Sequence, residues 1–151
     1  MHFGHAKVQA LRGITDDDIV HNWNEVVTKR DVVYVLGDVF QLARVPELRG
    51  TKKLALGNHD RRPADWYLNY FSQVRAMFEW DNCLLTHIPV HPNQRHRYRL
   101  NVHGHLHAHV VERDYVTRHG WKGSEPDSWY RCVSLEQTDF RPVLLRDVTE
   151  I

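Results

Sequence analysis

The pattern of apolar and polar positions predicts three helices in the first half of the chain. After Thr15 come three acidic residues and then apolar residues at positions 19, 20, 23, 26 and 27, a spacing that lines one face of a helix. Thr15 is suited to cap this helix, and the acidic residues of its first turn suit the positive end of the helix dipole. We expect shorter helices over residues 45–49 and 64–71, the second opened by Pro63.

Short apolar runs predict strands through the rest of the chain. Runs typical of buried strands cover residues 31–36, 52–56, 74–80, 82–86 and 99–102. A weaker alternation, typical of antiparallel or edge strands, covers residues 110–115, 129–135 and 140–146, and residues 119–127 are expected to form a loop. Helices and strands interleaved in this way indicate an α/β (α+β) fold.

The composition is that of one globular domain. The chain has 151 residues, of which 42% are hydrophobic, so we expect a single domain over residues 1–151. Lys and Arg number 20 and Asp and Glu 19, a balance that gives no support to a strongly basic nucleic-acid binder. The chain has no apolar stretch long enough to span a bilayer and does not open with a signal pattern. We therefore expect a cytoplasmic protein with no membrane partner and with its two cysteines reduced.

Polar clusters follow four of the predicted buried strands. They are Gly37-Asp38, then Gly57-Asn58-His59-Asp60, then His87, then His103-Gly104-His105-Leu106-His107. Because ligand sites form in the loops beyond strand ends, we expect the side chains of these clusters to meet at one sheet edge. We also expect an extended backbone to turn the rings of His105 and His107 to the same side.

Each cluster taken alone has a plain structural interpretation. Asp and Gly after a strand favour a turn, and a histidine-rich tract is often a surface tract, which is the interpretation that stays open for His103 and His109. Taken together, the clusters mix oxygen and nitrogen donors, which suit Mn, Fe or Zn better than Ca or Mg. The chain has no thiolate cluster, which argues against a structural zinc site.

The order of these clusters resembles the signature of the calcineurin-like metallophosphoesterases. The family motifs Asp-x-His, Gly-Asp, Gly-Asn-His-Asp, His and Gly-His-x-His match at His2, residues 37–38, residues 57–60, His87 and residues 104–107. The segments 2–5 and 129–144 look most like small bacterial and phage-encoded members. The resemblance implies a four-layer metallophosphoesterase β-sandwich flanked by helices. It also implies hydrolysis of a phosphate mono- or diester by a metal-activated water at a dinuclear centre.

The resemblance also implies a role for each matching residue. Two divalent ions (Mn, Fe, Zn or Ni) would be bridged by Asp38. The other ligands would be Asn58, His87 and His105 at one ion, and His2 and His107 at the other. By the same resemblance, His59 would protonate the leaving oxygen, and Asp60 would be its partner and orient its ring.

The substrate that the resemblance implies is a phosphorylated small molecule or a nucleotide. Arg62 and Arg95 lie near the motifs in the sequence and are candidates for binding its phosphate. Trp121 and Trp129 flank a loop; they are either residues that stack on a base or sugar, or ordinary packing residues.

The match is incomplete where the chain begins. The family places an Asp two residues before the histidine that matches His2, and a strand before that Asp; both are missing here, and Met1 falls on the middle residue of the motif. We expect that the natural start lies upstream of Met1. We also expect the chain as given to bind its second ion weakly and to turn over slowly, because that ion lacks a carboxylate ligand.

Three other functions stay open at this point. The chain is alternatively a metal-binding scaffold without catalytic activity, since a ligand and the first strand are missing. It is less plausibly a nucleic-acid-binding module that uses the arginines of residues 95–99, because the net charge of +1 does not support this. A different metal hydrolase, such as an amidase, is disfavoured only by the resemblance.

Overall fold

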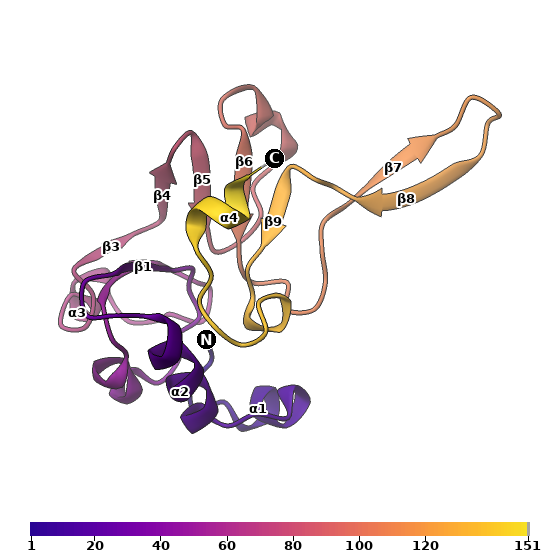
Figure 1. Ribbon diagram of the computed structural model, residues 1–151. Coiled ribbons are helices and arrows are strands. Elements are labelled where there is room, and N and C mark those ends of the chain that lie inside the picture. The colour runs from indigo at the N-terminus through magenta and orange to yellow at the C-terminus, as the bar shows by residue number, and fades with distance from the viewer. Residues whose placement is uncertain (151) are drawn as a thin grey trace.

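Two sheets form the body of the protein, and a separate hairpin projects from it (Figure 1). The computed structural model describes residues 1–150. The first sheet has the order β1-β2-β3 and is wholly parallel. The second has the order β4-β5-β6-β9, in which only the β4–β5 pair is antiparallel. The hairpin β7–β8 is a third, two-stranded sheet, so the chain has a mixed α+β fold.

Helices and strands are interleaved along the chain. The first part contains α1 (Ala6–Arg12), α2 (Asp16–Val26), β1 (Val32–Val35), the 3₁₀ helix η1 (Leu42–Glu47), β2 (Thr51–Ala55) and α3 (Ala64–Tyr67). Then come β3 (Gln73–Arg75), β4 (Met77–Trp80), β5 (Cys83–Thr86), the 3₁₀ helix η2 (Pro92–His96) and β6 (Leu100–His103). The last part contains β7 (Glu112–Val116), β8 (Lys122–Pro126), β9 (Tyr130–Cys132), the 3₁₀ helix η3 (Leu135–Gln137) and α4 (Leu145–Thr149). None of the helices within residues 1–150 is both long enough and apolar enough to cross a membrane.

The first sheet packs apolar side chains on both of its faces. Along β2, successive side chains point to opposite faces, so the neighbours Leu54 and Ala55 belong to two different apolar clusters. Leu54 packs with Ile19 and Trp23 of α2. The cluster around Ala55 consists of residues from both sheets and from α4, namely Tyr34, Leu36, Phe78, Leu85, Val102, Leu145 and Val148 among others. The two sheets are therefore joined by a shared apolar layer, and this layer fixes their strand ends relative to one another.

Several expectations about helices and strands are confirmed. The helix after Thr15 spans residues 16–26, and Thr15 and Asp18 form a capping box at its start. The strands expected at residues 31–36, 52–56, 82–86 and 99–102 are present within one residue or so of those bounds. The helix expected over residues 45–49 is a 3₁₀ helix over residues 42–47, and the helix over residues 64–71 is only the four-residue α3.

Other expectations about the strands are wrong. Residues 74–80 form two strands in different sheets rather than one, with the change of sheet at Ala76. The expected loop over residues 119–127 contains β8, which pairs with all five residues of β7. The strand expected over residues 129–135 is limited to β9, and residues 140–146 do not form a strand but lead into α4. Helix α1 was not expected.

Candidate metal centre

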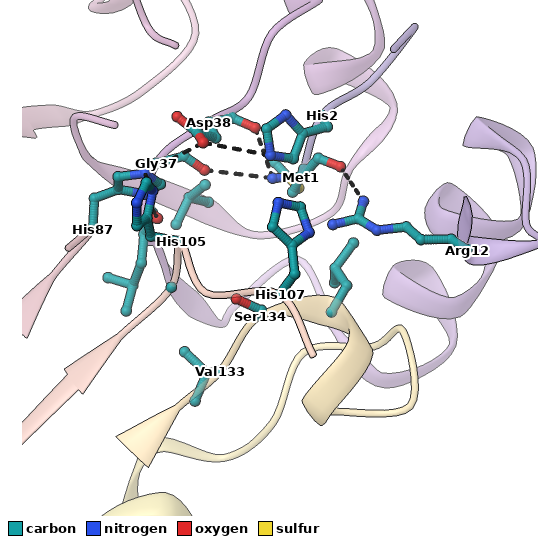
Figure 2. Close-up of a pocket in the computed structure, with 14 residues that line it drawn as sticks. Met1, His2, Arg12, Gly37, Asp38, His87, His105, His107, Val133 and Ser134 are labelled. Atoms are coloured by element: carbon teal, nitrogen blue, oxygen red, sulfur yellow. Dashed lines mark hydrogen bonds and ion pairs between the residues drawn. The ribbon is translucent and has the colours of Figure 1, made fainter. Parts of the chain in front are cut away.

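The polar clusters that follow β1, β2, β5 and β6 lie together, because the carboxyl ends of these four strands meet where the two sheets adjoin. The clusters that follow β1, β5 and β6, together with Met1, His2 and the loop after β9, line a small cleft with a volume of about 90 Å³ (Figure 2). The expectation of a single sheet edge is therefore corrected: β1 and β2 belong to one sheet and β5 and β6 to the other. The apolar layer between the sheets brings the two sets of strand ends together.

One side of the cleft is formed by Asp38, His87 and His105. One ligand atom from each of these residues lies within 4.8 Å of the other two. Nε2 of His87 lies 3.3 Å from Oδ2 of Asp38 and 3.2 Å from Nδ1 of His105. Oδ1 of Asn58 lies 2.9 Å from the same Nε2. The four residues that the resemblance assigns to one ion thus lie close together around Nε2 of His87.

The hydrogen bonding of His87 shows which of its ring nitrogens is available to a metal ion. Nδ1 of His87 lies 2.8 Å from the backbone carbonyl oxygen of Leu36, so this nitrogen carries a proton and donates it. In the neutral ring, the other nitrogen, Nε2, is then a lone-pair acceptor that faces further acceptors on Asp38 and Asn58. Acceptors that face one another repel unless a cation or a proton lies between them. A divalent cation fits this set of nitrogen and oxygen donors, and the bond to Leu36 is the kind of outer contact that fixes a metal-binding histidine.

Glycines allow the strand ends to approach so closely. A Cβ added at Gly57 would overlap the backbone N and Oδ1 of Asp38. A Cβ added at Gly37, whose φ is 79°, would lie 2.5 Å from Nδ1 of His87. The glycines that open the Gly37-Asp38 and Gly57-Asn58-His59-Asp60 segments therefore have a steric role, because any side chain at these positions would collide with a neighbouring candidate ligand.

Four of the six predicted ligands have a left-handed backbone. The φ angles are 62° for His2, 54° for Asp38, 67° for His105 and 54° for His107. Residues other than glycine rarely adopt this conformation, and such strain is concentrated at functional sites. The angles at His105 and His107 also correct one expectation, since the backbone there is a turn rather than an extended segment. The ring of His105 contacts His87, whereas the ring of His107 stacks on His2.

The other side of the cleft is formed by His2 and His107. Their rings are stacked with centroids 5.2 Å apart, and Nε2 of His2 lies 3.4 Å from Oδ2 of Asp38. Nδ1 of His2 is buried and has no hydrogen-bond partner among the described residues. Asp38 therefore lies between the two pairs of histidines, as a bridging carboxylate would.

A half-buried carboxylate that the sequence did not reveal, that of Glu136, orients His107. Nδ1 of His107 lies 2.7 Å from Oε1 of Glu136, which also accepts a hydrogen bond of 2.8 Å from Nε of Arg12. Burial raises the pKa of Glu136, but the hydrogen bonds from Arg12 and His107 outweigh it and lower this pKa to about 2. Glu136 lies in η3, outside every motif, so only the folded structure identifies it.

The protonation states suit metal binding. Burial is the main cause that lowers the pKa of His2 to about 3, and burial followed by the nearby His87 lowers the pKa of His105. Both rings are therefore neutral near neutral pH, which is the form that binds metal. Burial raises the pKa of Asp38, but the close contact with the His87 ring and the hydrogen bond from the His59 N–H outweigh it and hold this pKa well below its usual range.

The contacts of His59 and Asp60 differ from the expected pair. The carboxylate of Asp60 accepts hydrogen bonds from the backbone N–H groups of Asp38, Val39 and Gly57, at 2.8, 2.9 and 2.8 Å. Among the described residues, it makes no hydrogen bond to the ring of His59. Asp60 thus holds the two metal-binding loops together rather than orienting His59. The half-buried ring of His59 lies beside His2, with centroids 5.6 Å apart.

The two candidate phosphate-binding arginines have other contacts. Arg95 forms an ion pair with Asp127 and lies over the ring of Trp129, and neither Arg95 nor Arg62 lines the cleft. The guanidinium of Arg62 lies over the ring of Trp66, 5.4 Å from its centroid. Neither contact supports the expected role.

The histidine tract is not a surface tract throughout. His103 is fully buried in β6, and its Nδ1 lies 2.8 Å from the carbonyl oxygen of Gly104. His109 is exposed, as the surface interpretation expects.

Comparison with known proteins shows the fold of the chain but no activity. No family model matches it. The Gene 66 protein of Mycobacterium phage L5 is 27% identical over 183 residues, which cover 91% of this chain and 88% of that protein. Its counterpart in Mycobacterium phage D29 is 28% identical over 179 residues, with 91% and 89% covered. A solved protein of unknown function from Aquifex aeolicus superposes with a TM-score of 0.67 at 21% identity, over 97% of this chain and 92% of that one, so the two share a fold.

Proposed function

We propose that this protein hydrolyses phosphate esters at a centre of two divalent metal ions. The observation that carries the proposal is the convergence of Asp38, His87 and His105 at the ends of strands from two sheets. Asn58 completes this set, and His2 and His107 with Asp38 would hold the second ion. The finer fold that we infer is the metallophosphoesterase β-sandwich, supported by the apolar layer that joins the two sheets.

The chemistry follows from the donor set. Bound divalent ions would neutralise the charge of phosphate oxygens and lower the pKa of a water molecule, which is the usual contribution of paired metal ions to phosphoester hydrolysis. Asp38 remains a carboxylate because its pKa is held low. Asp60 fixes the loops that carry Asp38 and Asn58, through its hydrogen bonds to their backbones.

His59 is the residue best placed to act as a general acid. Its half-buried ring lies beside that of His2, and its backbone N–H donates a hydrogen bond of 2.9 Å to Oδ1 of Asp38. This bond fixes the backbone of His59 relative to the centre. A histidine ring at this place can give a proton to the oxygen of the departing alcohol.

The experiment that tests the proposal is hydrolysis of bis-p-nitrophenyl phosphate and of p-nitrophenyl phosphate with and without added Mn²⁺. We expect Mn²⁺-dependent release of nitrophenol, its loss in Asp38→Asn, and retention in Asp139→Asn, a control that alters an exposed carboxylate. His59→Gln should lower the rate about 10²- to 10⁴-fold while metal binding persists. Activity that survives in Asp38→Asn would refute the proposed centre.

A metal-binding protein without catalytic activity is the second candidate. It would retain the same ions at Asp38, His87 and His105 and hydrolyse neither ester. The alternative of a nucleic-acid module built on residues 95–99 gains no support from these contacts, because two of its three arginines are paired, Arg95 with Asp127 and Arg99 with Asp81.

A further inference from the structure

The β7–β8 hairpin is a projecting arm rather than part of the body. Figure 1 shows it extending away from both sheets, between the loop that follows β6 and the start of β9. Every residue of β7 is exposed, and no residue of β8 is fully buried. We call residues 112–126 the arm and residues 115–122 its tip. A two-stranded hairpin buries too little surface to be stable by itself in water, so a long exposed arm calls for a functional reason.

The arm has its own internal supports. Tyr115 lies opposite Gly123, and a Cβ at this glycine would come within 2.7 Å of the tyrosine ring, so the ring packs on the glycine backbone. In the stem, Arg113 and Glu125 form an ion pair of 2.7 Å. The turn is closed by the Thr117 N–H, which donates to the carbonyl oxygen of Trp121 at 2.8 Å. The tip is thus held in one arrangement that presents its side chains to solvent.

The tip combines an exposed indole with unpaired positive charge. The Trp121 side chain is 75% exposed, the second-highest value among the large hydrophobic residues described. Arg118 and Lys122 make no ion pair and no side-chain hydrogen bond within residues 1–150, and residues 115–122 contain no Asp or Glu. By contrast, Arg113 in the stem is paired. The net charge of +1 for the whole chain hides this local excess of positive charge.

We propose that the tip binds single-stranded nucleic acid, with the indole of Trp121 stacked on an unpaired base and with Arg118 and Lys122 on the flanking phosphates. Stacking of bases on exposed aromatic rings, beside cations that contact the backbone, is the general way in which proteins bind single strands without sequence preference. This inference does not depend on the proposed hydrolase activity, because the arm contains none of the metal-binding residues.

The composition of the tip favours this partner over two others. An apolar pocket on another protein would accept Trp121 and Val116 but would leave the positive charges of Arg118 and Lys122 without partners. A duplex would match the cations but offers no unpaired base to the indole. Only a flexible polyanion with accessible base faces uses both features of the tip.

The test is fluorescence anisotropy of a fluorescein-labelled oligothymidine titrated with the full chain in EDTA, so that metal-dependent hydrolysis plays no part. We expect Trp121→Ala to weaken binding about 5- to 100-fold and Trp121→Tyr to retain most of it, because tyrosine still stacks. Trp121→Leu should bind as weakly as the alanine variant. The double variant Arg118→Gln/Lys122→Gln should reduce the slope of log affinity against log salt by about 1.4, since each phosphate contact on a single strand contributes about 0.7.

Matched controls make the result decisive. Lys29→Gln/Arg30→Gln removes the same charge from an exposed turn in the body and should leave the salt slope unchanged. Thermal unfolding checks that each variant stays folded. The proposal is overturned by any of three results: no binding by the wild-type chain, equal binding of a duplex of the same length, or Trp121→Leu binding oligothymidine like wild type, which would show that stacking of the indole on a base does not contribute.

Discussion

Oε1 of Glu136 lies 2.7 Å from Nδ1 of His107, although the two residues are 29 positions apart in the sequence. The same carboxylate is held by Arg12, whose side chain is only 5% exposed. This contact leaves Nε2 of His107 free to bind a cation and fixes the ring plane. Carboxylates that orient metal-binding histidines in this way typically change metal affinity about 10- to 100-fold when they are removed.

The first prediction follows from this contact. Glu136→Ala should weaken Mn²⁺ binding at the His2–His107 side by about 10- to 100-fold, measured by isothermal titration calorimetry. Glu136→Gln should lose less, because its carbonyl oxygen can still accept the His107 proton. Glu125→Ala, which removes an exposed carboxylate from the arm, is the control and should bind as wild type. Equal Mn²⁺ affinities for the wild-type chain and all three variants would show that Glu136 does not support metal binding.

The second prediction concerns pH. The pKa of Glu136 falls from 4.5 to about 2 in the folded chain, so its ionised form stabilises the fold above about pH 4.5, and this contribution disappears as the pH falls toward 2. In metal-free protein, Glu136→Gln should lower the free energy of unfolding by about 1–3 kcal/mol near neutral pH. Urea unfolding at a series of pH values measures this difference, which should shrink toward zero in acid. A difference that stays constant with pH would contradict the assignment.

The third prediction concerns the close approach of two loops. Gly57→Ala would push its new methyl group into Asp38, so we expect a loss of about 1–3 kcal/mol of stability together with loss of metal binding. Gly120→Ala is the control, because a Cβ added at Gly120 has no atom within 4 Å. The only cost expected there comes from the positive φ of 79°. This substitution should cost about 1 kcal/mol and leave metal affinity intact. Normal metal binding by Gly57→Ala would show that the loops need not be so close.

The fourth prediction separates two roles for Asp60. If it holds backbone amides, Asp60→Asn should destabilise the metal-free chain by about 2 kcal/mol or more, because an amide group would face N–H donors that now point at a carboxylate. Chemical unfolding in EDTA measures this. If Asp60 mainly orients His59, the variant would instead keep its stability and lose only turnover.

The fifth prediction concerns the number of ions. In the 151-residue polypeptide, one side of the centre has four donor residues and the other has three, with Asp38 shared between them. We therefore expect one ion to bind tightly and the second more weakly, as seen in a two-phase calorimetric titration with Mn²⁺. Metal analysis that finds two tightly bound ions per chain after dialysis would contradict this.

The sequence allowed the main features of the site to be predicted, for identifiable reasons. Buried parallel strands are short apolar runs, and the polar residues that interrupt them mark the strand ends where ligands gather. The strand ends before Asp38 and His87 could be located in this way from local pattern, but the prediction that these residues bind metal depended on the order of all the motifs and on the resemblance it carries. The sequence could not show that the ends belong to two sheets, because residues 74–80 carry no break at the point where the chain changes sheet.

Other features depend on contacts between distant parts of the chain. Strand β8 has the sequence Lys-Gly-Ser-Glu-Pro, which has no strand-forming pattern, and its structure comes from pairing with β7. The burial of His103 follows from its place in a central strand. Glu136 has no sequence signal at all, since its role depends on Arg12 and His107 meeting it in space.

The central claim is that the side chains of Asp38, Asn58, His87 and His105 are the ligands of a metal ion. The most direct measurement is an anomalous difference map from crystals of the chain grown with Mn²⁺, recorded at the manganese edge. We expect the strongest peak of this map among Oδ2 of Asp38, Nε2 of His87 and Nδ1 of His105, and we expect Asp38→Asn crystals to lack it. A map without a peak there, from crystals grown with saturating Mn²⁺, would contradict the assignment of these residues as metal ligands.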